Sequence, residues 1–117
     1  MQKEEGTKPA YAIARLWNVR IGSDIGEYLN CIDATLKPFD GRFIVHGPAV
    51  ERMKGKWPDG DLIMIGFPDK DRLKAWYHSS DYAAIKALRT DNAEGELIFV
   101  EGVSENHRAR DVLTMRV

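Results

Sequence analysis

The chain has 117 residues, of which 44% are apolar and 30% are charged, a composition typical of one ordinary globular domain. Seventeen basic and eighteen acidic residues give a net charge of -1 with both signs scattered, which argues against nucleic acid as a partner. Every apolar run is shorter than the roughly 18 residues that a membrane-spanning helix needs, so we expect no membrane role.

The N-terminal segment, residues 1–9, is polar and ends in a proline, which predicts a flexible lead-in. It lacks the apolar core of a secretory signal, and the single cysteine, Cys31, has no partner for an internal disulfide. We therefore expect a cytoplasmic protein.

A strand and a helix are predicted next. Residues 11–17 have strand character, and apolar residues at helical spacing then predict a helix that ends near Pro38. Asp24 and Glu27 have the spacing of a capping box, although the hydroxyl of Ser23 competes for the cap position.

The middle of the chain predicts two more strands. Asp40-Gly41 forms a turn into a strand over residues 42–46, which is rich in Phe, Ile and Val. Residues 47–60 contain two prolines and three glycines and predict a long connection, and residues 62–67 predict the third strand.

Two short helices and a last strand follow. Pro68-Asp69 opens the first helix, and Ser79-Ser80-Asp81 interrupts it and supplies the cap of the second, which extends to Arg89. Residues 97–100 predict the fourth strand. The order is that of an α+β, ferredoxin-like βαββαβ sandwich, with an antiparallel four-stranded sheet and the second helix broken near Ser79-Ser80.

The strands over residues 62–67 and 97–100 are apolar on both alternating faces. Two helical segments can cover only one face of a four-stranded sheet. The other face would expose several hundred Å² of apolar surface, which is worth on the order of 10 kcal/mol if buried at about 25 cal/mol per Å². We therefore predict a homodimer through the sheet faces.

Over residues 10–103 the sequence resembles the domain of unknown function family 1330, of the dimeric α+β barrel superfamily. The motifs that carry the resemblance are Tyr11-Ala12-Ile13, Glu27-Tyr28, Gly41-Arg42-Phe43, Gly55-Lys56-Trp57-Pro58, and the segment from Phe67-Pro68 through Trp76-Tyr77, Ser79 and Tyr82 to Ala87-Leu88-Arg89. Asp40-Gly41 stands where relatives often have a Gly-Gly pair.

The resemblance implies a ferredoxin-like domain over residues 10–103, a dimer, and a small pocket between helices and sheet. It implies no particular reaction. Residues 104–117 lie outside it and are expected to form a C-terminal tail or an extra strand, with the segment from Asp111 onward as a possible arm across the interface.

Residues 67–89 concentrate aromatic and basic side chains, so we place the ligand there. The residues expected to bind it are Tyr28, His46, Trp76, Tyr82 and Arg89. An arginine can hold a carboxylate through two parallel hydrogen bonds, and a tyrosine joins an apolar ring to a polar anchor. The alternatives are a structural ion pair for the arginine and core packing for the tyrosines.

His46 and His78 are the candidates for proton transfer, since either can titrate near neutral pH. No further ligand stands at metal-binding spacing, so we expect neither a metal nor a cofactor. Asn18, Trp76 and His78 loosely resemble the Asn, Trp and His sets of cofactor-independent oxygenases in the superfamily.

The sequence thus favours a dimeric protein that binds a small anionic or aromatic metabolite. A cofactor-independent monooxygenase or isomerase stays open as an alternative, and so does a structural or interaction dimer without ligand.

Overall fold

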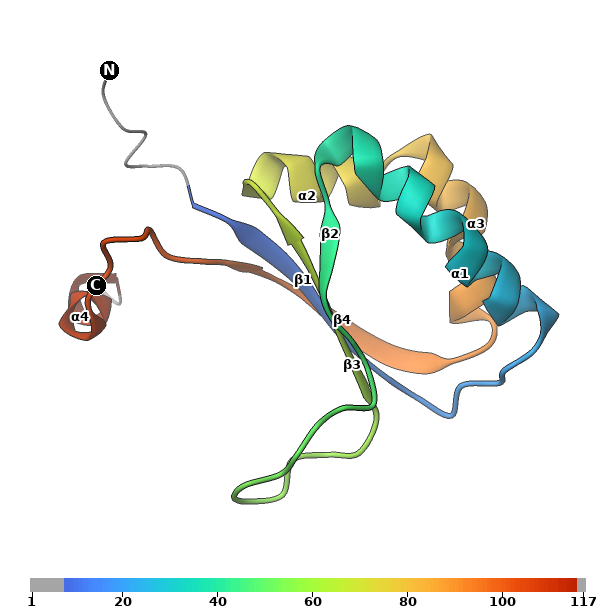
Figure 1. Cartoon of the computed structure of the whole chain (residues 1–117), viewed down its shortest axis with the longest axis horizontal. Coiled ribbons are helices and arrows are strands. Elements are labelled where there is room, and N and C mark those ends of the chain that lie inside the picture. The colour runs from blue at the N-terminus through green and yellow to red at the C-terminus, as the bar shows by residue number, and fades with distance from the viewer. Residues whose placement is uncertain (1–7, 116–117) are drawn as a thin grey trace.

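The computed structural model describes residues 8–115, so most of the expected lead-in lies outside it. Four antiparallel strands form one sheet in the order β2-β3-β1-β4, with helices on one face (Figure 1). The strands are β1 Ala10–Trp17, β2 Arg42–Gly47, β3 Asp61–Phe67 and β4 Glu94–Glu101. The α-helices are α1 Ser23–Leu36, α2 Lys70–Tyr77, α3 Ser80–Thr90 and α4 Val112–Met115, and short 3-10 turns are η1 Lys37–Phe39 and η2 Ala109–Asp111. The expected βαββαβ order is confirmed.

The N-terminal caps of α2 and α3 are the ones that the sequence predicts, whereas the cap of α1 is not. Asp69 caps α2 by accepting a hydrogen bond from the backbone N–H of Arg72, and Ser79 caps α3 through the N–H of Tyr82. The capping box expected from Asp24 is wrong. The N-cap of α1 is Gly22, which has no side chain to accept a bond, and the Asp24 carboxylate accepts from the Asn92 amide instead.

The turn before β2 places different demands on Asp40 and Gly41. Asp40 adopts a φ of 57°, a left-handed conformation that Asp tolerates better than most residues and that glycine adopts without strain. A Cβ on Gly41 would lie 2.6 Å from the Phe67 ring, so packing requires glycine there.

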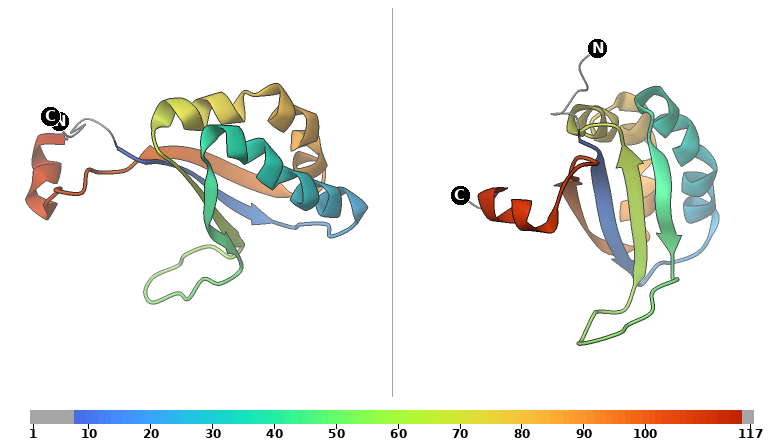
Figure 2. Two further views of the ribbon diagram at one scale, coloured as in Figure 1. Left: turned by 45° about the horizontal axis from the view of Figure 1, so that its top comes forward. Right: turned by 60° about the vertical axis from the view of Figure 1, so that its left-hand side comes forward.

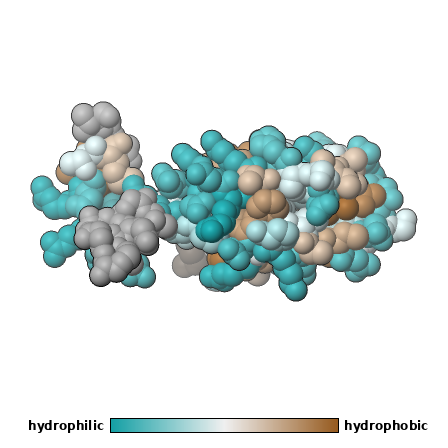
Figure 3. All heavy atoms as spheres, turned by 90° about the horizontal axis from the view of Figure 1, so that it is seen from above, coloured by the Kyte–Doolittle hydropathy of each residue, from teal (hydrophilic) through white to brown (hydrophobic). Residues whose placement is uncertain are grey.

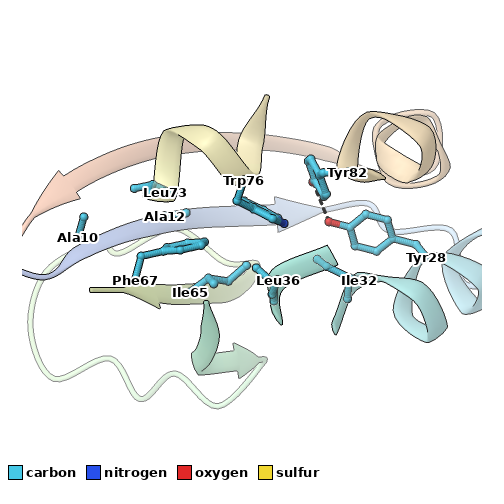
Figure 4. Packing of buried hydrophobic residues seen from close by; sticks show 10 residues of the cluster. All are labelled: Ala10, Ala12, Tyr28, Ile32, Leu36, Ile65, Phe67, Leu73, Trp76 and Tyr82. Carbon is cyan, nitrogen blue, oxygen red and sulfur yellow. Dashed lines mark hydrogen bonds between the residues drawn. The ribbon is translucent and has the colours of Figure 1, made fainter. Parts of the chain in front are cut away.

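The two faces of the sheet differ because successive residues of a strand point to opposite sides. One face packs on α1, α2 and α3 and forms the core, whose members include Leu36, Ile65, Phe67, Leu73 and Trp76 (Figure 4). Seen from above the helices, the surface is mostly hydrophilic with hydrophobic residues in between (Figure 3). The core is therefore a single layer between helices and sheet.

The opposite face of the sheet carries no helix (Figure 2). Large apolar side chains stand on it, among them Ile98, which is 56% exposed, and Val100, which is 38% exposed. Their register partners on β1 are Ile13 and Tyr11. We call this apolar surface the open face.

The C-terminal segment leaves β4 and ends in η2 and α4, which stand apart from the body on the side of the open face (Figures 1 and 2). It is helical rather than an extra strand. The radius of gyration is 16.2 Å, whereas a compact domain of this length has roughly 13 Å, and the projecting segment accounts for part of the difference. No helix within residues 8–115 has the length and apolar character to cross a membrane.

Candidate functional site

A cavity of about 160 Å³ lies between the sheet and helices α1 and α3. All five side chains expected to bind a ligand contribute to its wall: Tyr28, His46, Trp76, Tyr82 and Arg89. They come from four separate elements, so the fold brings together residues as distant in sequence as Tyr28 and Arg89. Most of the remaining wall is apolar.

The cavity exists because the central strand carries small side chains at its core-facing positions. Ala12 and Ala14 both line the cavity floor, where their neighbours across the sheet are larger residues such as Ile63 and Ile65. The bulk that an isoleucine or leucine would supply is missing at the centre of the sheet. Ala12 is buried, whereas Ala14 is only half-buried, and both line the cavity together with Trp76. The alternation Ala-Tyr-Ala-Ile-Ala in β1 is a sequence signal for this floor that our sequence analysis missed.

Two tyrosines and an arginine form the polar group of the cavity. The hydroxyls of Tyr28 and Tyr82 lie 2.8 Å apart, and both residues are buried (Figure 4). The Arg89 guanidinium donates a long hydrogen bond of 3.4 Å to the Tyr82 hydroxyl. Arg89 lies two helical turns after Tyr82, so the predicted pairing of these two side chains on one face of α3 is confirmed.

The protonation of this group follows from its surroundings. Burial, the largest influence, raises the pKa of the Tyr28 hydroxyl, and Tyr82 raises it further, while Arg89 lowers it by less. Burial lowers the pKa of Arg89, but the contacts with Tyr82 and Tyr28 outweigh that effect and the pKa is raised overall. At neutral pH Tyr28 keeps its proton and Arg89 keeps its charge, so both can donate hydrogen bonds.

Arg89 has no carboxylate partner among residues 8–115. The four ion pairs in this part of the chain involve Arg15, Arg52 and Arg72. The bond to Tyr82 is the only hydrogen bond of the Arg89 side chain to these residues, although its guanidinium is half-buried. Within this described part of the chain, the structural ion pair that the sequence left open as an alternative is thus not formed.

Trp76 and the tyrosines form an aromatic wall. The ring centroids of Trp76 and Tyr82 are 4.3 Å apart, and Tyr77 lies 5.7 Å from Tyr82. The Trp76 indole N–H donates to the hydroxyl of Thr35, a buried residue on α1, at 2.9 Å. Trp76 therefore offers a ligand its ring and not its N–H, and much of its role is core packing.

A second set of polar side chains lies on the sheet itself. His46 of β2 stacks on the Phe43 ring, with centroids 4.3 Å apart and planes inclined by 18°. Asp61, the first residue of β3, also lines the cavity, and sequence reasoning did not identify it. Within residues 8–115, no three side chains of His, Cys, Asp or Glu gather as metal ligands do.

The set of Asn18, Trp76 and His78 is not assembled. Asn18 is exposed, has a left-handed backbone with φ of 52°, and donates to the Glu94 carboxylate at 2.7 Å. His78 is exposed at the C-terminal end of α2, and neither residue lines the cavity. Of the two histidines considered for proton transfer, only His46 faces the candidate site.

A second hollow, of about 300 Å³, lies in the connection between β2 and β3. Its basic side chain, Arg52, pairs with Asp59 at 3.3 Å and donates to the Trp57 carbonyl. Its wall is formed mostly by exposed loop residues. Asp61 lines this hollow as well as the cavity under the helices, so what this hollow lacks is an unpaired, half-buried basic side chain like Arg89.

The comparisons with known proteins agree with the fold. A family model described as "Domain of unknown function (DUF1330)" matches residues 9–103, whereas no curated protein matches the sequence. The fold is similar to that of a protein of unknown function from Rhodopseudomonas palustris, with a TM-score of 0.60 and 10% identity over 83% of this chain and 84% of that chain. It is also similar to that of SnoaB, a cofactor-independent oxygenase from Streptomyces nogalater, with a TM-score of 0.57 and 14% identity over 86% of this chain and 99% of that chain. At such low identity the likeness extends to the α+β barrel fold alone.

Proposed function

The chain belongs to the family described as Domain of unknown function (DUF1330), and from the geometry of its cavity we propose that it binds a small aromatic carboxylate between helices and sheet. The observation that carries this proposal is Arg89, a half-buried cation without an ion pair among residues 8–115, on the wall of a mainly apolar cavity. Taking a charge out of water is costly unless an opposite charge or hydrogen bonds compensate it. An anion bound beside Arg89 supplies that compensation.

The hydrogen bonds of the polar group favour an anion as well. Arg89 donates to the Tyr82 oxygen, and either hydroxyl can donate in the bond between Tyr82 and Tyr28; when Tyr82 donates, the Tyr28 proton is left for a ligand. The row of donors thus ends in an O–H that can meet a carboxylate oxygen. A guanidinium and a hydroxyl together match the two oxygens of a carboxylate.

The size and lining of the cavity favour a ring next to the carboxylate. A dry apolar cavity of about 150 Å³ holds one benzene molecule in other proteins, so the 160 Å³ here has room for a ring of that size. The aromatic wall of Trp76, Tyr77 and Tyr82 provides stacking partners for it. Ile21 and Leu29, which are 82% and 45% exposed, form an apolar margin that a bound ring would partly cover.

Benzoate is the simplest probe of this proposal. We expect calorimetric titration to detect benzoate binding and Arg89→Ala to weaken it at least about tenfold, since a charge-assisted hydrogen bond contributes about 1.5–3 kcal/mol. The benzoate affinity of Arg89→Lys should fall between those of the wild type and Arg89→Ala, because an ammonium keeps the charge but lacks the planar pair of N–H donors of a guanidinium. Arg110→Ala, at an exposed arginine of η2, is the matched control and should leave binding unchanged. Equal benzoate affinity in Arg89→Ala and wild type would contradict the proposal.

We also propose that the protein acts as a homodimer through the open face. The exposed Ile98 and Val100 and the C-terminal segment that projects on the same side support this assembly. The cytoplasmic location expected from the sequence stays a prediction.

A second candidate function is a cofactor-independent reaction in the same cavity, with His46 moving a proton. Two observations favour it: the fold likeness to SnoaB and the position of His46 on the cavity wall. Consumption of an aromatic substrate that is lost in His46→Ala would establish it. Binding of an aromatic carboxylate without its consumption would support the first function. A dimer that binds no aromatic carboxylate would favour a structural or interaction role.

A further inference from the structure

His46 and Asp61 lie on the core-facing side of the sheet, at the β2 edge of the cavity. His46 is the register partner of Ile63, and Asp61 precedes Ile63 by two residues on β3, so both side chains point to the same face. Diagonal neighbours of this kind have Cα atoms roughly 7–8 Å apart, close enough for both side chains to reach one ligand group.

Arg89 lies on the other side of the cavity. One row of register partners crosses the sheet from His46 through Ile63 and Ala14 to Leu97, and all four residues line the cavity. Strands are about 4.8 Å apart, so this row spans roughly 14 Å between the backbones of β2 and β4. Arg89 is the penultimate residue of α3, and only three residues separate the end of this helix from the start of β4, so Arg89 lies toward the β4 side. The Arg89 group and the His46–Asp61 pair therefore approach a ligand from different sides.

The two sides differ in charge. Arg89 is a cation, and Asp61 brings a carboxylate, which accepts hydrogen bonds and repels another carboxylate. A ligand carboxylate is attracted to Arg89 and excluded from the β2 edge, so its orientation is fixed. The atom that faces Asp61 is then favoured if it donates a hydrogen bond. His46 is exposed at the edge of the cavity, and its ring stacks on Phe43.

Building on the proposed function, we propose that the site selects aromatic carboxylates that carry a hydroxyl or amino group on the side of the ring away from the carboxylate. Asp61 accepts the hydrogen bond of that group and His46 orients it. Such a ligand has a carboxylate at one end, a ring in the middle and a hydrogen-bond donor at the other end. These groups match Arg89, the aromatic wall and Asp61 in that order. Asp61 and His46 determine specificity, whereas Arg89 provides the common anchor.

The test compares 4-hydroxybenzoate and 4-aminobenzoate with benzoate by calorimetric titration. We expect both substituted ligands to bind at least about tenfold more tightly than benzoate to the wild type, because a hydrogen bond to a charged acceptor is among the stronger ones. Asp61→Ala should reduce this preference for the substituted ligands over benzoate to less than about threefold. Asp61→Asn keeps the side-chain volume and should give an intermediate preference. It replaces Asp61→Ala as the deciding variant if the latter does not fold.

Asp59→Ala is the control, since Asp59 is an exposed carboxylate of the same connection that pairs with Arg52 outside the cavity. It should retain the full preference. Benzoate binding without any preference for the substituted ligands, or a preference that survives in Asp61→Ala, would overturn this inference and leave the proposed function standing. Failure of all three ligands to bind would overturn both.

Discussion

The two faces of the sheet are formed by alternate residues of the same strands. One face is covered by helices and encloses a cavity, and the other is an uncovered apolar surface. On the helix side of β1, Ala12 and Ala14 leave space beneath the helices, and that space is a cavity lined by Arg89, which forms no ion pair with residues 8–115. On the open face, Ile13 and its partner Ile98 present large apolar side chains to solvent. The first face lacks volume and, among residues 8–115, a carboxylate paired with Arg89, whereas the second lacks a cover. A small ligand suits the first face and a second copy of the chain suits the second.

The largest effect is expected in the helix-covered core. Leu73 of α2 is 0% exposed, so Leu73→Ala removes fully buried methyl groups and leaves a void. We expect the free energy of unfolding to fall by about 2–5 kcal/mol in chemical denaturation. Lys74→Ala, at the exposed neighbour, should change it by less than about 0.5 kcal/mol at the same protein concentration. A loss below about 1 kcal/mol in Leu73→Ala would show that this layer is not the stable core.

A charge on the open face should affect assembly and not folding. Ile98→Asp places a carboxylate where two sheets are expected to meet, and we predict at least an about 100-fold weaker dimer in sedimentation, or about 2.7 kcal/mol. Ala83→Asp, on the exposed side of α3, is the matched control and should sediment like the wild type. A wild type that is already a monomer at micromolar concentration would refute the dimer.

Tyr28 makes the covered face sensitive to high pH. The pKa of Tyr28 is raised in the folded state, so the unfolded chain loses this proton first as the pH rises above about 10. Stability should therefore fall above that pH, by up to about 1.4 kcal/mol per pH unit for this group. Tyr28→Phe should reduce the slope in denaturation experiments repeated at several pH values. A slope as steep in the variant as in the wild type would assign the effect to other residues.

The smallest effect is expected at His78, which is exposed and outside the cavity. His78→Ala should change benzoate affinity by less than about twofold. A larger change would restore His78 to the site, and with it the oxygenase-like reading of Asn18, Trp76 and His78.

Much of the fold follows from local patterns in the sequence. The caps at Asp69 and Ser79 and the apolar strands 62–67 and 97–100 are short-range features, and they define the elements and their order. The start of α1 could not be predicted, because Asp24 finds a partner in Asn92, which is distant in sequence. Such a contact has no local signal.

The candidate site could be predicted in part. Tyr82 and Arg89 share a helix face, so their spacing placed them together, whereas their contact with Tyr28 depends on how α1 packs against α3. Asp61 was missed because a charged residue next to a predicted strand usually marks the boundary of that strand and faces solvent. The alanines of β1 were missed because a cavity arises from absent volume, which hydropathy patterns do not measure.

The proposed binding site for an aromatic carboxylate includes the space next to Ala14 on the cavity floor. Ala14→Leu fills that space with side-chain atoms and leaves Arg89 and both tyrosines in place. Calorimetric titration with benzoate should give one bound ligand per protomer in the wild type and an affinity at least about tenfold weaker in Ala14→Leu, with the dimer and the melting temperature retained. Equal benzoate binding by the two proteins would contradict the claim and place the ligand elsewhere.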